Sequence, residues 1–513
     1  MKVVTTQEMR KIEESCIAHH ITTDQLMERA GLEVAKACRR ILGSVAGKRI
    51  LVLIGPGNNG SDGLVTARYL ARWGATIYAY IVTQRPPDDV KLDAVIVEDI
   101  KLLAASADTE YQCLEHELNR CHMVIDAVLG TGTTRPLDGT VKQVMSRISN
   151  RNGELVALDL PTGVNPDTGQ TDPASPKADF TISLGFPKVG LYQFPAAENV
   201  GQLEVADIGI PAILAKDISL ELLTRSWVKA RMPTRRINAH KGDFGHALLI
   251  GGSLNYPGAI SLAAQAALRS GPGLVTLAAP QKIQPMLAST ITEAIHLPVP
   301  DDGLGILAPQ GISTVQENLS AYSSIGIGCG MGRANATQKF IEELLMAEPS
   351  VHQPTVIDAD GLRILSHVEN WWDRLKTPAI LTPHPGEMSD LTGIPTSEIQ
   401  TRRIEVVKQW AKHWGTVVVL KGAFTVVAGP TGKCWINPFA NPLLATGGTG
   451  DVLTGIIAGF LAQGISLEEA ACCGIYIHAA SAEKASGTFG DRGATAGDLL
   501  KLLPSVTRSL MEM

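Results

Sequence analysis

The segment RILVLIGPGNNGSDG (residues 49–63) joins an apolar run to a glycine-rich stretch and sets the fold of the first half of the chain. Arg49–Ile54 reads as a buried strand, and Asp62–Trp73 reads as the helix that follows it. Small residues at a helix start leave backbone N–H groups free, and these groups attract phosphate together with the helix dipole. The segment therefore predicts an α/β domain that binds a phosphate-bearing ligand.

A second glycine-rich segment, ATGGTGDVLTG (residues 445–455), opens a long apolar helix near the other end of the chain. It is no copy of the first, but each segment holds one aspartate among its glycines, Asp62 and Asp451. A carboxylate beside phosphate is unfavourable unless it binds a cation or transfers a proton. Two unlike segments of this kind predict two different active sites.

Apolar runs alternate with helical patterns along most of the chain, which predicts parallel sheets covered on both faces. In the first half, residues 7–42 read as amphipathic helices, and further strands are expected at Thr76–Val82, Met123–Ala127, Leu155–Leu160 and Phe180–Leu184. In the second half, strands are expected at His246–Ile250, Leu274–Ala278, Ile325–Gly328, Thr355–Asp358, Ala379–Leu381, Val417–Leu420 and Thr425–Ala428. Helices are expected there at Pro257–Arg269, Thr337–Met346, Arg402–Trp414, Asp451–Ala462 and Leu467–Ala485.

The alternating pattern weakens over residues 212–240, where we expect a domain boundary near residue 220. The sequence thus predicts a Rossmann-like parallel-sheet domain over 1–220 and a second α/β domain over 221–513. No repeat of fixed period is visible, so the two domains differ. The weak stretch ends in basic residues, which fit a solvated linker better than a functional basic patch.

Composition excludes several classes of protein. Of the 513 residues, 45% are hydrophobic and 19% charged, as in globular proteins. The net charge of −6 argues against nucleic acid as a partner. Eight scattered cysteines without a CxxC pair indicate a reducing compartment and no zinc site. The polar start and the absence of an uninterrupted apolar span predict no signal peptide, no membrane partner and a cytoplasmic location. We also expect a homo-oligomer.

The first glycine-rich segment matches the dinucleotide fingerprint as Gly55-x-Gly57-x-x-Gly60, but the strand at Thr76–Val82 ends in Thr83-Gln84 rather than in an acidic residue. The carboxylate that holds the ribose is therefore missing, which argues against an ordinary NAD-dependent dehydrogenase.

Two later segments place oxygen-bearing side chains at strand ends, VIDAVLGTGTTRP (124–136) and VALDLPTGVNPDTG (156–169). Ligands of open parallel sheets bind at the carboxyl ends of strands. We therefore expect the side chains Asn59, Asp126, Asp159 and Thr162 to converge there.

Together these segments resemble NAD(P)H-hydrate epimerase, whose pattern reads NNGGDG, DALLGTG and DxPSG, over residues 9–210. Ser61 replaces the second glycine of that family, and Thr162 its usual serine. The resemblance implies a K⁺ site at Asn59, Asp126 and Thr162 and a catalytic role for Asp159, although a structural strand-end aspartate is the alternative. It also implies substrate contacts from Asn58, Asn59, Gly60, Ser61, Asp62, Gly130, Thr131, Gly132, Thr133, Thr134, Arg135, Pro136 and Asp159.

The second half carries further ligand-binding patterns. The run VVLKGAFTVVAG (418–429) reads as two short strands around a tight turn, suited to a nucleotide. His384 lies between two prolines in LTPHPGE (381–387), which favours substrate contact over a core position. The GGTGD segment (447–451) resembles the anion hole of the ribokinase-like superfamily, which implies that Asp451 acts as a base, and a helix-capping role is the alternative. YPGA (256–259) and GIGCGMG (326–332) are glycine-bearing turns that allow close approach of a ligand.

With HKGDFGHALLIGGS (240–253), these patterns resemble the ribokinase-like ADP/ATP-dependent NAD(P)H-hydrate dehydratases over 224–508. The resemblance implies a ribokinase-like domain, Mg²⁺, and ADP as phosphoryl donor. It implies contacts to the hydrated nucleotide from Ala259, Gly330, His384 and the catalytic Asp451. It implies contacts to ADP from Lys421, Gly422, Ala423, Phe424, Thr425, Asn441, Pro442, Leu443, Leu444, Ala445, Thr446, Gly447, Gly448, Thr449 and Gly450.

The combined hypothesis is a bifunctional repair enzyme, an isomerase and a lyase on one chain, with hydrated NADH or NADPH and ADP as its small-molecule partners. Two alternatives stay open at this stage. One is a ribokinase-like kinase with a regulatory nucleotide-binding module at its N-terminus. The other makes the first half a binding scaffold without catalysis.

Overall fold

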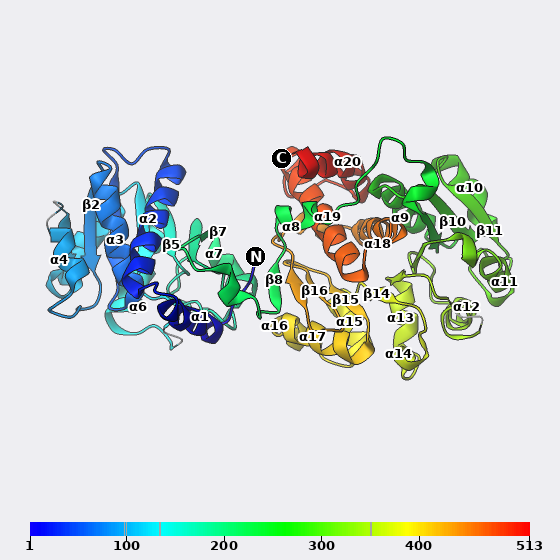
Figure 1. Ribbon diagram of the computed structural model, residues 1–513, viewed down its shortest axis with the longest axis horizontal. Helices are drawn as coiled ribbons and strands as arrows, with labels where there is room; N and C mark the ends of the chain where they lie inside the picture. Colours follow the sequence, from blue (N-terminus) through cyan, green and yellow to red (C-terminus); the bar gives the residue numbers. More distant parts are fainter. Residues whose placement is uncertain (97, 99, 133–134, 349–350, 513) are drawn as a thin grey trace. The chain divides into compact units, whose positions relative to one another are not determined.

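The computed structural model describes residues 1–96, 98, 100–132, 135–348 and 351–512. The chain forms two compact units, Met1–Ile218 and Ser219–Met513, shown in Figure 1. The division falls beside residue 220, where the alternating sequence pattern weakens. Each unit has its own sheet and its own apolar core.

The sheet of the first unit has seven strands in the order β3-β2-β1-β4-β5-β6-β7, and all neighbouring pairs are parallel. This is the doubly wound order with one strand added at the β6 edge. The strands are β1 (Arg49–Ile54), β2 (Thr76–Ile81), β3 (Lys101–Ala104), β4 (Met123–Ala127), β5 (Glu154–Leu158), β6 (Phe180–Leu184) and β7 (Gln202–Ala206).

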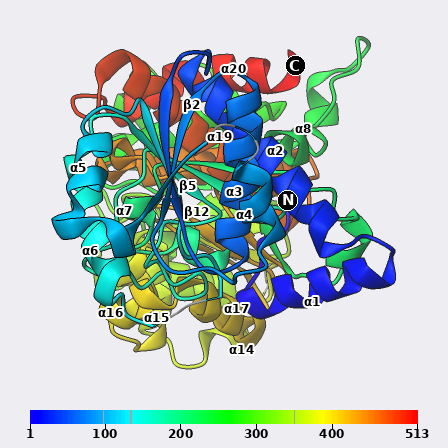
Figure 2. The ribbon, with the colours of Figure 1, turned by 90° about the vertical axis from the view of Figure 1, so that its left-hand side faces the viewer.

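Helices cover both faces of this sheet. They are α1 (Thr6–Ala18), α2 (Thr23–Leu42), α3 (Asn58–Arg72), α4 (Val90–Ile96), α5 (Gln112–Leu118), α6 (Gly139–Arg147) and the short α7 (Ala197–Val200). Figure 2 shows the strands between α5 and α6 on one side and α2, α3 and α4 on the other. Capping boxes, Thr5 with Glu8 and Thr22 with Gln25, fix where α1 and α2 begin.

The helix after β1 begins at Asn58, four residues before the predicted start. Gly57 is its N-cap, so the residues that we expected in a loop form the first turn of α3 instead. Small polar residues suit a first turn because their side chains interfere little with its free N–H groups. The predicted strand Leu155–Leu160 ends earlier, at Leu158, which releases Asp159 from the sheet.

The sheet of the second unit has ten strands in the order β11-β10-β9-β12-β13-β14-β15-β16-β17-β8. Its strand pairs are parallel except those that β16 makes with β15 and β17. The strands are β8 (Leu220–Leu222), β9 (His246–Ile250), β10 (Leu274–Pro280), β11 (Ile295–Val299), β12 (Ser324–Ile327), β13 (Thr355–Ile357), β14 (Ala379–Leu381), β15 (Val417–Leu420), β16 (Val426–Ala428) and β17 (Cys434–Ile436).

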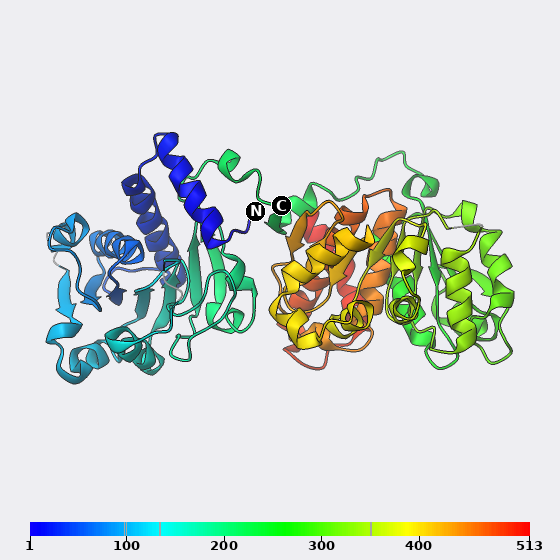
Figure 3. The same ribbon diagram turned by 90° about the horizontal axis from the view of Figure 1, so that it is seen from below.

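Two helical layers enclose that sheet. The first packs into the main core and contains α8 (Arg225–Lys229), α9 (Pro257–Ser270), α10 (Gln284–Thr290), α18 (Thr449–Ala462), α19 (Leu467–Phe489) and α20 (Ala496–Glu512). The other helices are α11 (Ile312–Gln316), α12 (Asn335–Met346), α13 (Asp360–Ser366), α14 (Trp371–Arg374), α15 (Pro385–Thr392), α16 (Thr396–Thr401) and α17 (Arg403–Trp414). In Figure 3 the yellow helices of this second group lie in front of the sheet.

The basic stretch before β9 is more than a solvated linker, because two of its arginines pack on aromatic rings. Arg231 lies 3.8 Å from the centroid of the Trp227 ring and 3.1 Å from Glu469. Arg235 stacks on Phe244 in the same way. No helix among the described residues is long and apolar enough to span a bilayer.

Candidate functional site

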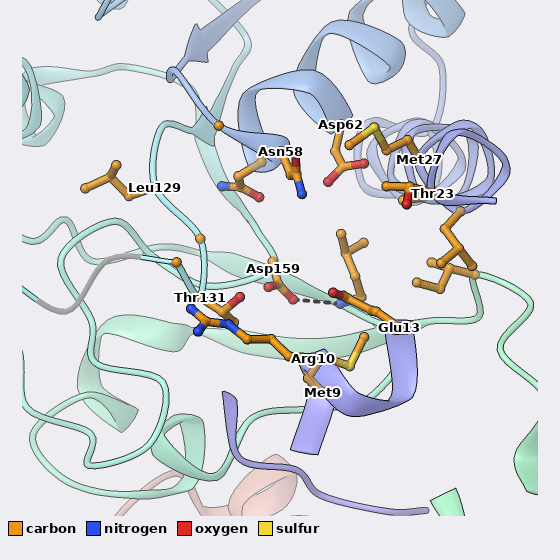
Figure 4. Close-up of a pocket in the computed structure, with 18 of the residues that line it drawn as sticks. Met9, Arg10, Glu13, Thr23, Met27, Asn58, Asp62, Leu129, Thr131 and Asp159 are labelled. Atoms are coloured by element: carbon orange, nitrogen blue, oxygen red, sulfur yellow. Dashed lines mark hydrogen bonds between the residues drawn. The ribbon is translucent and has the colours of Figure 1, made fainter. Parts of the chain in front are cut away.

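A cavity of about 510 Å³ opens at the carboxyl ends of β1, β4 and β5, where the sequence predicted the first site (Figure 4). Helices α1 and α2 form its other walls. Of the predicted site residues, it is lined by Asn58, Asn59, Asp62, Gly130, Thr131, Gly132 and Asp159. The volume is ample for a ligand the size of a nicotinamide nucleotide head.

Four other residues predicted for the first site, Gly60, Ser61, Arg135 and Pro136, do not line the cavity. Gly60 and Ser61 face the protein rather than the cavity, because a Cβ at Gly60 would meet the Arg85 guanidinium at 2.5 Å. Arg135 and Pro136 are exposed and do not line the cavity. Thr133 and Thr134 lie outside the described residues.

The buried side chain of Arg85 stabilises the glycine-rich turn by hydrogen bonds. Its guanidinium donates to the Gly55 carbonyl, to the Gly57 carbonyl at 3.4 Å and to the Ser61 hydroxyl at 2.8 Å. Its Nε bonds Asp89. Ser61, the departure from the family's glycine, therefore supplies an acceptor for a buried arginine.

Asp126 is fully buried, and its hydrogen bonds tie β4 to the turn after β5. One carboxylate oxygen accepts from the Thr162 hydroxyl at 2.7 Å, and the other from the Thr162 N–H at 2.8 Å. Burial raises the pKa of Asp126, although the hydrogen bonds from Thr162 oppose this. Asn59 lies on the cavity wall with a buried Nδ2 that has no partner among the described residues.

Asp159 has a backbone φ of +69°, a strained value for a residue other than glycine. This turn aims its carboxylate at Lys188, which donates to it, and at the Leu184 N–H, 3.0 Å away. Lys188 is 1% exposed and also donates to the Leu184 carbonyl at 3.1 Å. The predicted catalytic aspartate thus forms a buried ion pair beside the cavity.

Asp62 projects into the cavity from α3 (Figure 4). Burial raises its pKa well above the usual range, and the charges of Asp159 and Glu13 raise it further. Glu13 lies on α1, and burial raises its pKa as well. Sequence reasoning missed Glu13, Lys188 and Arg85, because each stands apart from the glycine-rich segments.

In the second unit, the second glycine-rich segment forms the N-terminus of α18. Gly448 is the N-cap with a φ of +91°, where a Cβ would also strike Leu262 at 2.6 Å. Asp451 is the third residue of the helix, and the N-cap forms no side-chain hydrogen bond. The capping alternative for Asp451 is therefore wrong.

A buried polar cluster lies beside this helix start. Lys421 donates to Asp358 at 2.6 Å and lies 3.7 Å from Glu387, while Thr454 donates to Asp358 at 2.7 Å. Burial alone would raise the pKa of Asp358, but the Lys421 ammonium holds it below its usual range. A Cβ at Gly450 would come within 3.6 Å of both Asp358 and Lys421, so the glycine segment and the cluster share one site.

Asp451 has the chemistry of a base near neutral pH. Burial and then the negative charge of Asp358 raise its pKa to about 6, although a hydrogen bond from the Cys329 thiol opposes this. Gly330, which follows Cys329 in the chain, has a φ of +64°. A Cβ on Gly330 would meet Ala259 and the Tyr256 carbonyl, both at 2.7 Å. Ala259 and Gly330 therefore lie in the same region as Asp451, and their contact with a hydrated nucleotide stays a prediction.

His384 has a structural task beside any contact with substrate. It is the N-cap of α15, and its Nδ1 accepts from Gly386 N–H at 3.0 Å and Glu387 N–H at 3.1 Å. Burial and the charge of Lys421 lower its pKa, which keeps the ring neutral. The ring is about half exposed on the same side as Lys421.

The predicted nucleotide-binding residues form two neighbouring segments. Lys421–Thr425 is the turn of the β15–β16 hairpin, as predicted, with Phe424 at a φ of +50°. Residues 441–445 form a short 3₁₀ turn that leads into α18, and Thr449 donates to the Leu444 carbonyl at 2.8 Å. The Asn441 side-chain amide donates hydrogen bonds to Glu483 and to the Ser486 hydroxyl, both at 2.9 Å, so Asn441 stabilises the turn.

Sequence reasoning missed Asp358, Glu387 and Thr454. Glu387 stands in the quoted LTPHPGE segment, and Thr454 lies one turn after Asp451 on α18. Asp358 ends the predicted strand Thr355–Asp358. Its position at the carboxyl end of a parallel strand could have identified it as a site residue.

Comparisons with known proteins agree with this division. Residues 23–190 match the family model of the YjeF-related protein N-terminus, and residues 247–505 match that of NAD(P)H-hydrate dehydratase. The "Bifunctional NAD(P)H-hydrate repair enzyme Nnr" of Moorella thermoacetica is 40% identical over 100% of this chain and 98% of its own length. The protein of the same name from Escherichia coli is 32% identical over 95% of this chain and 90% of its own.

Among solved structures, a ribokinase-like superfamily protein from Enterococcus faecalis has a TM-score of 0.50 and 25% identity, covering 57% of this chain and 98% of its own. The class is thus a two-unit α/β enzyme, with a Rossmann-like first unit and a ribokinase-like second one. The chain belongs to the family of bifunctional NAD(P)H-hydrate repair enzymes.

Proposed function

We propose that this chain repairs hydrated NADH and NADPH in two steps. The first unit interconverts the R and S forms at C6 of the ring. The second unit removes water from the S form, consuming ADP and releasing AMP and phosphate. The observation that carries the proposal is the pair of unlike helix starts, one with the buried Asp62 and the other with the partly buried Asp451, in a chain that matches the family over its full length.

In the dehydratase step, Asp451 takes the proton of the C6 hydroxyl, whose oxygen then attacks the terminal phosphorus of ADP. AMP leaves, and the phosphorylated C6 oxygen becomes a good leaving group. Loss of phosphate from C6, followed by loss of a proton from C5 to solvent, forms the C5–C6 double bond and restores the dihydropyridine ring. A pKa of about 6 leaves Asp451 ionised at neutral pH, while keeping it basic enough to accept the proton.

The backbone N–H groups of Gly447, Gly448 and Gly450 stabilise the charge that builds on the transferred phosphoryl group, whereas the Thr449 N–H donates to the Thr446 carbonyl. Lys421 adds a positive charge within reach of the same glycines. The residues Lys421, Gly422, Ala423, Phe424 and Thr425, with the turn 441–446, are proposed to hold the nucleotide. Ala259, Gly330 and His384 are proposed to hold the hydrated nucleotide.

The second site fits a magnesium nucleotide. Mg²⁺ bound to nucleotides takes one or two carboxylates and several waters. Asp358 and Glu387 are both buried beside Lys421, and burial raises the pKa of Glu387 while Lys421 lowers it. These two carboxyl groups are proposed to hold Mg²⁺ through water, and the ion would shield the phosphates.

The first site fits a potassium ion. Asp126 is fully buried and has no cationic partner among the described residues, so a bound cation would balance its charge. The Asn59 amide oxygen and the Thr162 hydroxyl are neutral oxygen donors of the kind that alkali cations take. Asn59, Asp126 and Thr162 are proposed to hold K⁺, which orders the cavity floor.

For the epimerase step, Asp159 is proposed to give acid–base help at the C6 hemiaminal centre, while Asn58, Asp62 and the segment from Gly130 to Gly132 hold the nucleotide. The remaining predicted contacts, among Gly60, Ser61 and residues 133–136, belong to the same proposal. Gly60 and Ser61 would act by shaping the turn. Because the dehydratase consumes one epimer, the first unit supplies it from the other.

The test uses the purified S epimer, Mg²⁺ and either ADP or ATP. We expect NADH absorbance to return with ADP, and AMP and phosphate to form in equal amounts. A stable phosphorylated product without NADH would instead support the alternative, a ribokinase-like kinase with a regulatory first unit. NADH formation with ATP alone would overturn the assignment of ADP as donor.

Two coarser expectations can be tested in parallel. We propose that the protein is a homo-oligomer located in the cytoplasm. Light scattering after gel filtration gives the mass of the assembly, and a mass of 54.5 kDa would identify a monomer and contradict the first point. Cell fractionation tests the second.

A further inference from the structure

Asp62 and Asp159 reach the first cavity from different walls. Asp62 projects from α3, and Asp159 follows β5 and lies on the other side of the open space (Figure 4). Both line the cavity, and their charges interact. A flat ring held between them would turn one face toward each carboxyl group.

The surroundings of the two carboxyl groups differ. Asp159 has the Lys188 ammonium in direct contact, as described above. The Asp62 carboxyl group accepts no hydrogen bond from the described residues, although the Asp62 carbonyl accepts one from the Thr66 hydroxyl, and the residue is only 7% exposed. Burial raises its pKa first, and the neighbouring Asp159 and Glu13 add to this, while Lys91 and Lys188 oppose it. Asp62 is thus suited to carry a proton and Asp159 to receive one.

We propose that epimerisation at C6 proceeds by loss and return of water between these two groups. Asp62 acts as the acid for the hydroxyl on one face of the ring, and Asp159 acts as the base for a water molecule on the other. The inference rests on the proposed epimerase function of the first unit and assigns Asp62 a catalytic role beyond contact with substrate.

The step balances without a further reactant. Asp62 gives its proton to the C6 hydroxyl, the C6–O bond breaks, and the oxygen leaves as water while the N1 lone pair forms a C6–N1 double bond. Water on the opposite face adds to C6, the double-bond electrons return to N1, and Asp159 takes the released proton. C6 is inverted, and proton exchange with solvent restores both carboxyl groups. The reverse reaction uses the same two groups with their roles exchanged.

A different route would break the C6–N1 bond, turn the resulting aldehyde and close the ring again. That route keeps the original oxygen and requires proton transfer at N1 and at one oxygen. It has no use for two carboxyl groups on opposite walls. The placement of Asp62 and Asp159 therefore favours the exchange of water.

An isotope experiment separates the two routes. The full chain carrying Asp451→Asn, which blocks the dehydratase, is incubated with one purified C6 epimer in H₂¹⁸O, beside an enzyme-free control. We expect each newly formed molecule of the opposite epimer to carry ¹⁸O at early times. Enzyme-dependent formation with the original oxygen retained would overturn the water route and leave the epimerase function intact. No formation above the control rate would overturn the epimerase function itself.

A substitution tests the acid. In the chain that carries Asp451→Asn, Asp62→Asn is expected to lower kcat for formation of the opposite epimer about 100- to 10,000-fold, with a much smaller change in KM. The matched control is Asp108→Asn, a buried carboxyl group of the same unit that bonds Tyr80 outside the cavity; it should keep the full rate. An undiminished rate in Asp62→Asn would overturn the role of Asp62. If that variant does not fold, the ¹⁸O result in the chain with Asp62 intact still decides the route.

Discussion

At the residue scale, each unit places a lysine against a buried aspartate: the buried Lys188 pairs with Asp159, and the partly buried Lys421 pairs with Asp358. A charge removed from water is stable only when it is paired and hydrogen-bonded. Each pair lies beside an aspartate with a raised pKa, Asp62 in the first unit and Asp451 in the second. The pairs therefore set the electrostatic surroundings of the groups that carry protons.

Local sequence marks two of the three members of each arrangement. Asp62 and Asp451 stand among glycines, Asp159 follows an apolar strand and Lys421 lies in a predicted turn, whereas Lys188 and Asp358 were not predicted. Lys188 lies 29 positions from Asp159, and Lys421 lies 63 positions from Asp358. Partners at such separations are set by the order of strands in the sheet, which no local pattern encodes.

The role of Asp451 is tested by Asp451→Asn. The amide cannot accept the hydroxyl proton, so NADH formation from the S epimer should fall about 100- to 10,000-fold. Stabilisation of the protein by ADP in a thermal melt should persist, because the glycine N–H groups are unchanged. A variant that keeps more than a tenth of the activity would show that another group is the base.

The pH dependence of the dehydratase follows from the pKa of about 6 for Asp451. The base must be ionised, so activity is present above this pKa and is lost as the pH falls through it. With the S epimer, kcat/KM should be flat above neutral pH and drop about tenfold per pH unit well below 6. An activity that stays constant down to pH 5 would contradict this assignment.

The buried pair in the first unit predicts strong coupling. Lys188→Met leaves the Asp159 carboxylate without its cation and should lower the free energy of unfolding by about 3–5 kcal/mol. Adding Asp159→Asn should restore part of that loss, because no uncompensated charge then remains. Urea denaturation of the two single variants and the double variant measures the coupling, and strictly additive effects would exclude it.

At the element scale, the start of α3 depends on Arg85, which ties the turn before the helix to the helix itself. Edge strands are where sequence prediction was weakest. The edge strands β3, β7, β8 and β11 were missed, as was β17 beside β8, and the exposed or half-buried residues of β3, β7 and β11 leave no apolar run to recognise. The central strands β4, β6 and β14 match their predicted bounds, since they are buried on both faces and read as continuous apolar runs.

The brace at α3 is tested by Arg85→Met. Losing the bonds to the Gly55 carbonyl and the Ser61 hydroxyl should loosen the helix start and raise the epimerase KM by about tenfold, while dehydratase kinetics stay unchanged. The matched control is Arg72→Met at the C-terminal end of α3, where the arginine pairs with Glu98 at the surface. Equal kinetics in the two variants would show that the brace has no part in binding.

At the scale of the whole molecule, the sequence predicted two unlike α/β domains, and the chain divides into two compact units of that kind. The two glycine-rich helix starts led to this prediction, because phosphate binding requires small residues and free N–H groups within one short segment. The contribution of α1 to the first cavity was not predicted, since an amphipathic helix gives no sign of which cavity it covers.

The separation of the two chemistries predicts complementation. Asp159→Asn should lose the epimerase alone, and Asp451→Asn the dehydratase alone. Mixing the two variants should restore conversion of the R epimer, because the S epimer can diffuse from one protein to the other. Failure of the mixture, with each variant active in its own remaining step, would indicate that the intermediate is not released.

The central claim is that one chain returns both epimers to NADH. The most direct measurement incubates the unmodified protein with an equal mixture of the two C6 epimers, Mg²⁺, K⁺ and ADP, and follows NADH absorbance to its end point. We expect complete conversion on a time scale much shorter than uncatalysed epimerisation, and with Asp159→Asn a halt once the S epimer is consumed. No NADH with either ADP or ATP would contradict the account.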